Sequence, residues 1–152
     1  SAPGIGAARG AVEIFRERLK TRKVVGTQTV LSEKPNYQVM LAKADVMVQT
    51  AELQHMACVR EVHAMAVRNE VHDIGARMAI VARNSFATRL ARDAVRLIVD
   101  NAGSSVHLLT DPLQRISRDV NVVCGHVIQD FETLAEQHGR QMLGLPPVTY
   151  IF

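Results

Sequence analysis

The feature that most constrains the fold is a stretch of helical apolar spacing that runs from residue 36 to residue 69. Its apolar side chains recur at three- and four-residue intervals, which is the period of one face of an α-helix. They form two stripes: Met40, Ala44, Met47, Ala51, Cys58, Val62 and Met65, and Leu41, Val48, Val59 and Ala66. At a rise of ~1.5 Å per residue this helix would span about 50 Å. Because it is apolar on more than one face, we expect it to contact several neighbours.

The same period predicts three further helices, over residues 5–22, 74–101 and 127–143. The period lapses over residues 23–34, which favour a short extended segment, and Ser32-Glu33-Lys34-Pro35 is typical of a helix start with Pro35 in the first turn. Asp73 stands where an N-cap is expected, and Asn101-Ala102-Gly103 is a strong C-terminal stop. The long interruption over residues 102–126 is expected to hold a short extra helix. Residues 1–152 are therefore predicted to form a single all-α domain, an up-down four-helix bundle of long helices with a short extra helix in the 102–126 connection.

Composition agrees with this fold and excludes several functional classes. Aromatic residues make up only 4% of the chain and there is no Trp, whereas a β-sandwich favours β-branched and aromatic residues. The net charge is +3, with Lys and Arg spread among acids, so we expect no nucleic-acid partner. No apolar run reaches the roughly 18 residues of a membrane span, and no basic segment is followed by an apolar stretch near residue 1, so we expect neither a membrane partner nor a secretory signal. Cys58 and Cys124 are interpreted as buried thiols in a reducing, cytoplasmic setting, and no Cys/His cluster indicates a metal site.

The residues that could carry chemistry lie mainly in the 102–126 connection. Gly103, Ser104 and Ser105 follow a long helix and offer backbone N–H groups and hydroxyls to a polar ligand or a phosphate. They also suit a helix C-cap and turn, which the residues alone favour. His126 follows Gly125 at a turn, where an imidazole can do acid–base work or simply cap a helix. The pattern by itself leaves these alternatives open.

Two separated segments carry a resemblance to a known family. Arg22-Lys23-Val24-Val25-Gly26 resembles an Arg-x-x-Phe-Gly signature in which Val25 replaces the aromatic residue. Ala102-Gly103-Ser104-Ser105, then Pro112-Leu113-Gln114-Arg115 and Arg118-Asp119, resemble a glycine-containing flavin loop and a Pro-x-x-Arg-x-x-Arg-Asp helix. Ser104 stands in the place of the second glycine. The chain is similar over its whole length to the C-terminal helical domain of the acyl-CoA dehydrogenase superfamily.

One position separates the branches of that superfamily. Many dehydrogenases place their catalytic Glu nine positions after the Arg of Arg-Asp, and here that position is Val127, which cannot abstract a proton. The residue before it is His126. With Gly139-Arg140-Gln141-Met142-Leu143-Gly144 near the C-terminus, the chain is most similar to the two-component flavin-dependent monooxygenases.

That resemblance implies a role for each candidate residue. His126 would lie near the flavin ring and the substrate as the catalytic residue. Arg22 would meet the flavin phosphate of a neighbouring subunit, and Gly103, Ser104 and Ser105 would approach the flavin from the loop. The cofactor would be reduced FMN or FAD, delivered by a separate flavin reductase and used with O₂ on a small aromatic or polycyclic substrate. Family members form homotetramers through this domain, so a homo-oligomer is expected.

Relatives also carry an N-terminal helical domain and a middle β-barrel, so we expect this chain to be a fragment of a larger protein and inactive by itself. Two alternatives remain open from the sequence. One is an acyl-CoA dehydrogenase-type oxidoreductase domain whose base comes from elsewhere, for example Glu61 or Glu70. The other is a helical oligomerisation module without chemistry. The substrate and the choice between FMN and FAD are not set by these residues.

Overall fold

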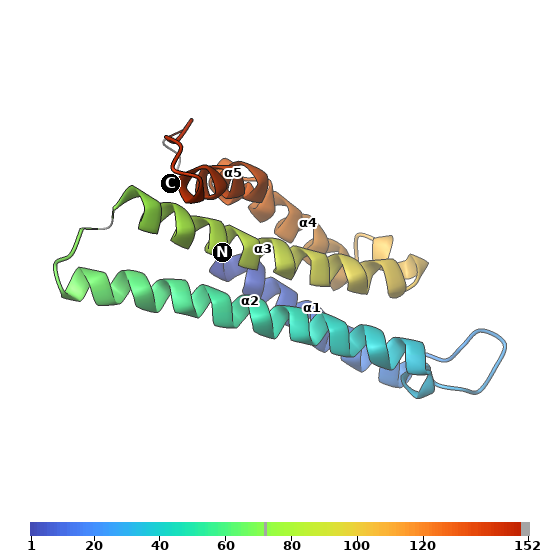
Figure 1. Cartoon of the computed structure of the whole chain (residues 1–152). Helices are drawn as coiled ribbons and strands as arrows, with labels where there is room; N and C mark the ends of the chain where they lie inside the picture. Colours follow the sequence, from blue (N-terminus) through green and yellow to red (C-terminus); the bar gives the residue numbers. More distant parts are fainter. Residues whose placement is uncertain (72, 150–152) are drawn as a thin grey trace.

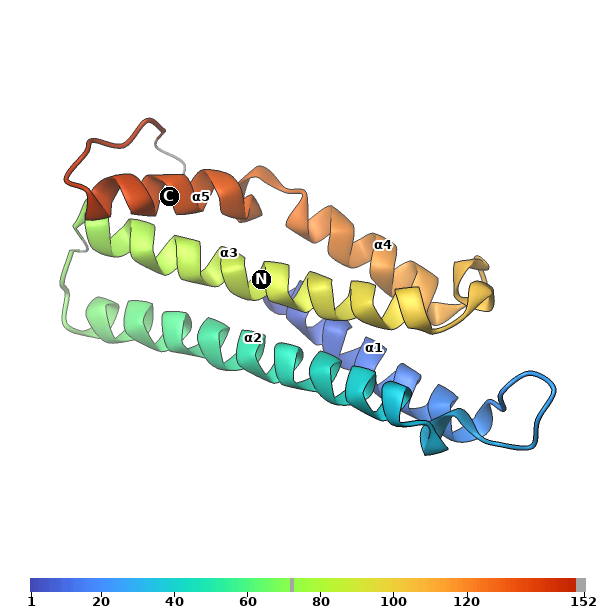
Figure 2. The same ribbon diagram turned by 45° about the vertical axis from the view of Figure 1, so that its right-hand side comes forward.

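The computed structural model describes residues 1–71 and 73–149, and in this part of the chain it is an elongated helical bundle (Figure 1). Its α-helices are α1 (Ala2–Thr21), α2 (Pro35–Val67), α3 (Ile74–Asn101), α4 (Pro112–Cys124) and α5 (Phe131–Met142). Helices α2 and α3 form a long antiparallel pair, with α1 packed against both. Helices α4 and α5 follow each other along α3, as Figure 2 shows, so together they make the fourth rod of the bundle. The predicted all-α four-helix architecture is confirmed.

Helix α3 is the centre of the domain because it packs on α1, α2, α4 and α5. Small side chains let the helices approach closely. Ala8, Ala11, Ala44, Ala51, Ala87, Ala91 and Ala94 are fully buried where these helices meet. Phe15, Ile98 and Leu113 fill the space between them. This is a densely packed alanine-rich core that a chain with few aromatic residues can build.

The helix ends follow local capping chemistry. The side chain of Asp73 accepts a hydrogen bond from the backbone N–H of Ala76 at 2.7 Å, so the predicted N-cap of α3 is confirmed. Helix α3 also ends at Asn101 as predicted. The fourth helix differs from its predicted range of 127–143, since α5 begins only at Phe131. The Asp130 side chain caps it, and residues 127–129 form a separate 3₁₀ turn, η3 (Val127–Gln129).

The extra helix expected in the 102–126 connection is α4, and it is a full member of the bundle. Its first turn is anchored by Asp111, whose carboxylate accepts from the N–H of Leu113 at 2.9 Å and pairs with Arg18 of α1 at 2.6 Å. Both side chains of that ion pair are largely shielded, with 11% and 15% of their surfaces exposed. A 3₁₀ turn, η2 (Ser104–His107), precedes α4 and follows the end of α3.

The segment between α1 and α2 is a short hairpin-like loop. An isolated antiparallel bridge joins Lys23 and Val30, which agrees with the predicted extended segment. A short 3₁₀ turn, η1 (Leu31–Glu33), then leads into α2, which begins at Pro35 as expected. No helix in the described part of the chain is both long and apolar enough to cross a membrane.

Candidate functional site

Arg22 joins two parts of the chain that are distant in sequence. It stands at the end of α1, and its Nη1 donates to the carbonyl oxygen of Ala102, at the end of α3, at 2.7 Å. Its Nη2 donates to the Ser105 hydroxyl in η2. The guanidinium carries five N–H donors, so donors remain after these contacts. The structure thus brings together two of the sequence-predicted segments, residue 22 and residues 103–105.

Gly103 makes this approach possible. Its φ is +83°, in the left-handed region that favours glycine. A Cβ on Gly103 would lie 2.9 Å from Nη1 of Arg22. A side chain there would therefore force the guanidinium away from the end of α3. Gly103, predicted as part of the helix stop, therefore also leaves room for the Arg22 guanidinium.

A depression of about 670 Å³ opens beside this contact. Its lining includes Arg22, Gly103 and Ser104 from the predicted set, together with Lys23, Lys34 and Tyr37 from the loop and the start of α2. Three cationic side chains line it and no described lining residue is acidic. Such a setting favours a phosphate or another anion, because several cations line it without a competing carboxylate.

Sequence reasoning did not find Lys34 and Tyr37. The sequence pointed to them only indirectly, because it predicted an extended segment that leads to a helix start at Pro35. That turn returns the chain to the end of α1, where Leu31 N–H donates to the Arg22 carbonyl at 2.8 Å. Pairing of the two arms therefore determines which side chains line the depression.

His126 lies in a different place, at the junction between α4 and α5. Helix α4 separates His126 from the group around Arg22 and Gly103, and its 13 residues span about 20 Å. His126 is exposed and caps η3, with its Nδ1 accepting from the N–H of Ile128 at 3.3 Å. Because a backbone N–H can only donate, Nδ1 is the acceptor, and the proton of the neutral ring lies on Nε2. The imidazole thus presents an N–H donor to the surroundings of the junction.

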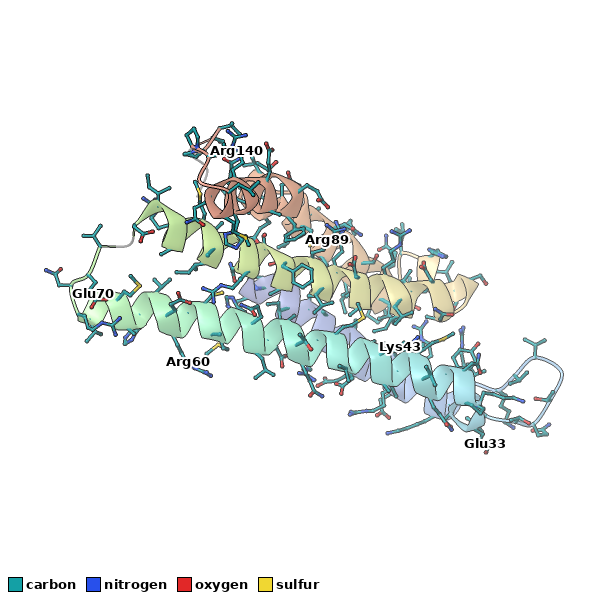
Figure 3. The ribbon with its side chains drawn as sticks, viewed as in Figure 1. Glu33, Lys43, Arg60, Glu70, Arg89 and Arg140 are labelled. Carbon is teal, nitrogen blue, oxygen red and sulfur yellow. The ribbon has the colours of Figure 1, made fainter. Side chains whose placement is uncertain are left out.

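The residues named as alternative bases have other partners. Glu61 of α2 forms an ion pair with Arg83 of α3 at 2.5 Å, and Glu70 pairs with Arg68 at 2.8 Å. Figure 3 shows Glu70 at the far end of the α2–α3 pair from Glu33, which lies at the start of α2 near the depression. Arg118 and Asp119 of the motif contact each other at 3.2 Å on the exposed face of α4. No described group of His, Cys, Asp and Glu could hold a metal ion.

Comparison with known proteins identifies the family. The sequence model of the family "Acyl-CoA dehydrogenase, C-terminal domain" matches residues 1–131 of this chain. The chain belongs to this family. As an acyl-CoA dehydrogenase C-terminal domain, it has the fold that the resemblance implied.

Two curated relatives of this acyl-CoA dehydrogenase-type domain are hydroxylases. A pigment production hydroxylase of Rhodococcus sp. (strain ATCC 21145) is 31% identical over 142 residues, which are 93% of this chain and 36% of the relative. The oxygenase component of an FADH(2)-dependent resorcinol hydroxylase from Rhizobium sp. (strain MTP-10005) is 26% identical, over 95% of this chain and 37% of the relative. The chain therefore spans a little over one third of the length of these relatives.

Solved structures share the fold of this acyl-CoA dehydrogenase-type domain. XiaF from Streptomyces sp., in complex with FADH2 and glycerol, superposes with a TM-score of 0.90 at 20% identity, over 96% of this chain and 37% of that one. The 3-HSA hydroxylase from Rhodococcus sp. RHA1 gives 0.86 at 24% identity, and the HsaA monooxygenase from M. tuberculosis gives 0.85 at 22%. Both of these alignments cover all of this chain and 38% of the other. At these identities the likeness establishes the fold.

Proposed function

We propose that this chain is the C-terminal helical part of the oxygenase component of a two-component flavin-dependent monooxygenase. The observation that carries the proposal is His126 at the α4–α5 junction, with its Nδ1 held by the backbone N–H of Ile128 and its Nε2–H available as a donor. Val127, at the position of the dehydrogenase base, has no group that can abstract a proton. The two hydroxylase relatives support the same branch.

The proposed reaction is hydroxylation of a small aromatic substrate. Substrate, O₂ and reduced flavin give hydroxylated substrate, water and oxidised flavin, so one oxygen atom enters the product and the other leaves as water. The flavin supplies the two electrons when bound. The part of His126 is to orient the substrate, with its Nε2–H donating a hydrogen bond to a phenolic oxygen. The closed surroundings that keep water from the reaction would come from the remainder of the parent protein together with this domain.

The residues around Arg22 fit the phosphate end of a flavin. Gly103 forms a cradle that a Cβ would fill, Arg22 keeps unused guanidinium donors, and Lys23 and Lys34 add positive charge. Because this depression lies about the length of α4 from His126, we propose that one chain offers its His126 to one flavin and its Arg22 group to the flavin of a neighbouring subunit. The FADH(2)-dependent resorcinol hydroxylase relative and the structural neighbour XiaF, solved with FADH2, favour reduced FAD over FMN.

A homotetramer is the assembly that this arrangement suits, and the outer face of α2 supports self-association. Val39, Val46, Leu53 and Val67 recur at multiples of seven residues, and 52–72% of each is exposed. Arg60, of the same stripe, points away from α3 in Figure 3. An apolar stripe with this spacing is typical of a surface that packs on another helix. The other proposed partner is a separate flavin reductase, and the two unpaired cysteines favour a cytoplasmic location.

The test uses the parent protein with a flavin reductase, NADH and O₂, and measures hydroxylated product from resorcinol-type substrates. We expect product in the wild type and a loss of about 100-fold or more in His126→Ala, the scale of a lost acid–base or hydrogen-bonding group. His107→Ala is the matched control, because His107 is an exposed histidine in η2, at the other end of α4. Unchanged turnover in His126→Ala would overturn the assignment. Flavin bleaching by an acyl-CoA, without reductase, would instead establish a dehydrogenase.

A further inference from the structure

The junction that carries His126 is tied to one residue of the central helix from both sides. Two positions before His126, the Cys124 thiol lies 3.5 Å from the Thr88 carbonyl oxygen, to which it donates. Three positions after it, the Gln129 side-chain carbonyl accepts from the Thr88 hydroxyl at 2.9 Å. Thr88 lies in the middle of α3. The main chain and the side chain of a single residue thus hold the two flanks of the candidate catalytic residue.

Thr88 is well suited to hold a fixed geometry. It is completely buried, and α1 closes over it at Gly4, where an added Cβ would lie 3.7 Å from the Thr88 methyl group and 3.4 Å from Val123 of α4. A β-branched side chain in a helix has few rotamers. Its hydroxyl has two acceptors within hydrogen-bond distance, Gln129 Oε1 in the junction at 2.9 Å and the Asn84 carbonyl oxygen of its own helix at 3.2 Å, and the contact to the junction is the shorter one.

A second chain of donors ends on the same Gln129 oxygen. The amide Nδ2 of Asn84 donates to the Ser1 hydroxyl at 2.7 Å, and that hydroxyl donates to Gln129 Oε1 at 3.2 Å. Asn84 Oδ1 in turn lies 2.8 Å from Nδ1 of His55 on α2. Gln129 is therefore oriented by groups from α2, α3 and the start of the chain, and chains of hydrogen bonds of this kind reinforce one another.

The backbone hydrogen bonds of the junction are local, such as the one from the Gln129 N–H to the His126 carbonyl oxygen at 2.7 Å, so these side chains are what tie it to the central helix. Between the end of α4 at Cys124 and the start of α5 at Phe131 there is only the three-residue turn η3. The cap that fixes the His126 ring is made to Ile128, one residue before Gln129. A displacement of Gln129 therefore moves the N–H that holds the imidazole.

We propose that Thr88 and Gln129 are positioning residues that set the orientation of the His126 ring through the turn η3. The inference rests on the proposed role of His126 in hydroxylation. Neither side chain is assigned a contact with substrate or flavin. Their effect is on the direction of the Nε2–H donor, and a misdirected donor lowers turnover rather than substrate affinity.

The experiment compares variants of the full-length oxygenase with its reductase, measuring kcat, substrate KM and product formed per NADH. Thr88→Val removes the hydroxyl and keeps the β-branch, Gln129→Met removes the acceptor from a partly exposed turn, and Thr88→Ser keeps the hydroxyl. The matched control is Ser85→Ala, which removes another buried hydroxyl of α3 whose bond goes to Ala82 of the same helix. We expect kcat to fall about 10-fold in Thr88→Val and Gln129→Met, with KM changed less than about two-fold. Thr88→Ser should recover most of kcat, and Ser85→Ala should retain it.

The decisive measurement repeats Thr88→Val in a His126→Ala background. If Thr88 acts through His126, the second change adds no further loss, because the effects of residues that act as a unit are not additive. An equal loss in both backgrounds would show a general structural role and overturn the proposal, as would a Thr88→Val enzyme with wild-type kcat beside an impaired His126→Ala enzyme. If His126→Ala itself is silent, the proposed function fails first and the positioning role falls with it.

Discussion

The guanidinium of Arg22 donates to the carbonyl oxygen of Ala102 at 2.7 Å, and so joins the end of α1 to the end of α3 across 80 residues of sequence. This contact places a cation beside the one residue of the loop, Gly103, whose φ is positive. The carbonyl is one of those left without an intrahelical partner at the C-terminus of α3. A helix end that would otherwise need water or a cap is satisfied here by a side chain that also faces a depression.

Gly103→Ala should lower the free energy of unfolding of this chain by about 1–2 kcal/mol, because an L-residue is strained at φ +83°. The contact at 2.9 Å with Arg22 adds to the cost unless the guanidinium moves. Gly10→Ala is the control, since nothing lies within 4 Å of a Cβ there and α1 is helical at that point. It should raise the same free energy by about 0.5–1 kcal/mol. Urea unfolding measures the change in unfolding free energy for both variants. Changes of the same sign in the two variants would contradict the role given to Gly103.

Arg22→Ala should weaken flavin binding by the parent protein about 10- to 100-fold, because a charge-assisted contact to phosphate and the support of the 103–105 loop are lost together. Arg22→Lys should recover part of the affinity, since it restores charge without the planar fork of donors. The matched control is Arg16→Ala, which removes an exposed cation of α1 whose ion pair, among the described residues, is with its neighbour Glu17. Fluorescence titration with FAD would measure the three variants. A flavin affinity equal to wild type in Arg22→Ala would remove this residue from the site.

Burial of the Cys124 thiol raises its pKa above the ordinary value, while the nearby Arg92 opposes the shift. The folded protein therefore retains the thiol proton at a pH where the unfolded chain, whose cysteine pKa is about 8.5, begins to lose it. The contribution of the protonated thiol to the free energy of unfolding is fully present below the pKa of the unfolded chain. It decreases as the pH rises through the pKa of the folded protein. Unfolding free energies of wild type and Cys124→Ala should thus differ by a constant amount up to about pH 8, and the advantage of wild type should shrink above it. A difference that grows with pH would contradict the direction of the shift.

Leu53→Glu should dissociate the proposed oligomer without unfolding the bundle. Leu53 has 70% of its surface exposed at the centre of the α2 stripe, so a carboxylate costs little in one subunit but would be buried in an interface between two. The control is Leu109→Glu, the same change at a leucine that is 86% exposed in the loop before α4. Light scattering gives the mass, and circular dichroism checks the helix content. A tetramer that persists in Leu53→Glu would place the interface elsewhere.

Local signals predicted much of the fold. Asp73 and the Asn101-Ala102-Gly103 stop set both ends of α3, and Pro35 set the start of α2, because capping groups and proline act within a few residues of their own backbone. The start of α5 was wrong by four residues, since apolar side chains at Val127 and Ile128 continue the helical period through a turn that the Asp130 cap interrupts. The family and its fold were correctly identified from the motifs at residues 22–26 and 102–119.

The site was predicted less completely. Arg22 and Gly103–Ser105 were named from separate motifs, and the structure brings them into contact. Lys34 and Tyr37 were not found, because they reach the depression only through the pairing of two loop arms. Thr88 and Gln129 were not found either, because a threonine inside a helical pattern and a glutamine in a turn carry no local signal.

By itself, the sequence determined the helices and the position of the long connection, and it led to the prediction of His126 as the catalytic residue, because periodicity, caps and motif spacing are local properties of the chain. Only the tertiary structure decided that Arg22 reaches Ala102 and that His126 lies about one α4 length away from that contact. It also decided that Thr88 holds both flanks of His126. The physical reason is that such contacts depend on how helices pack across the core, and packing relates residues that no sequence interval connects.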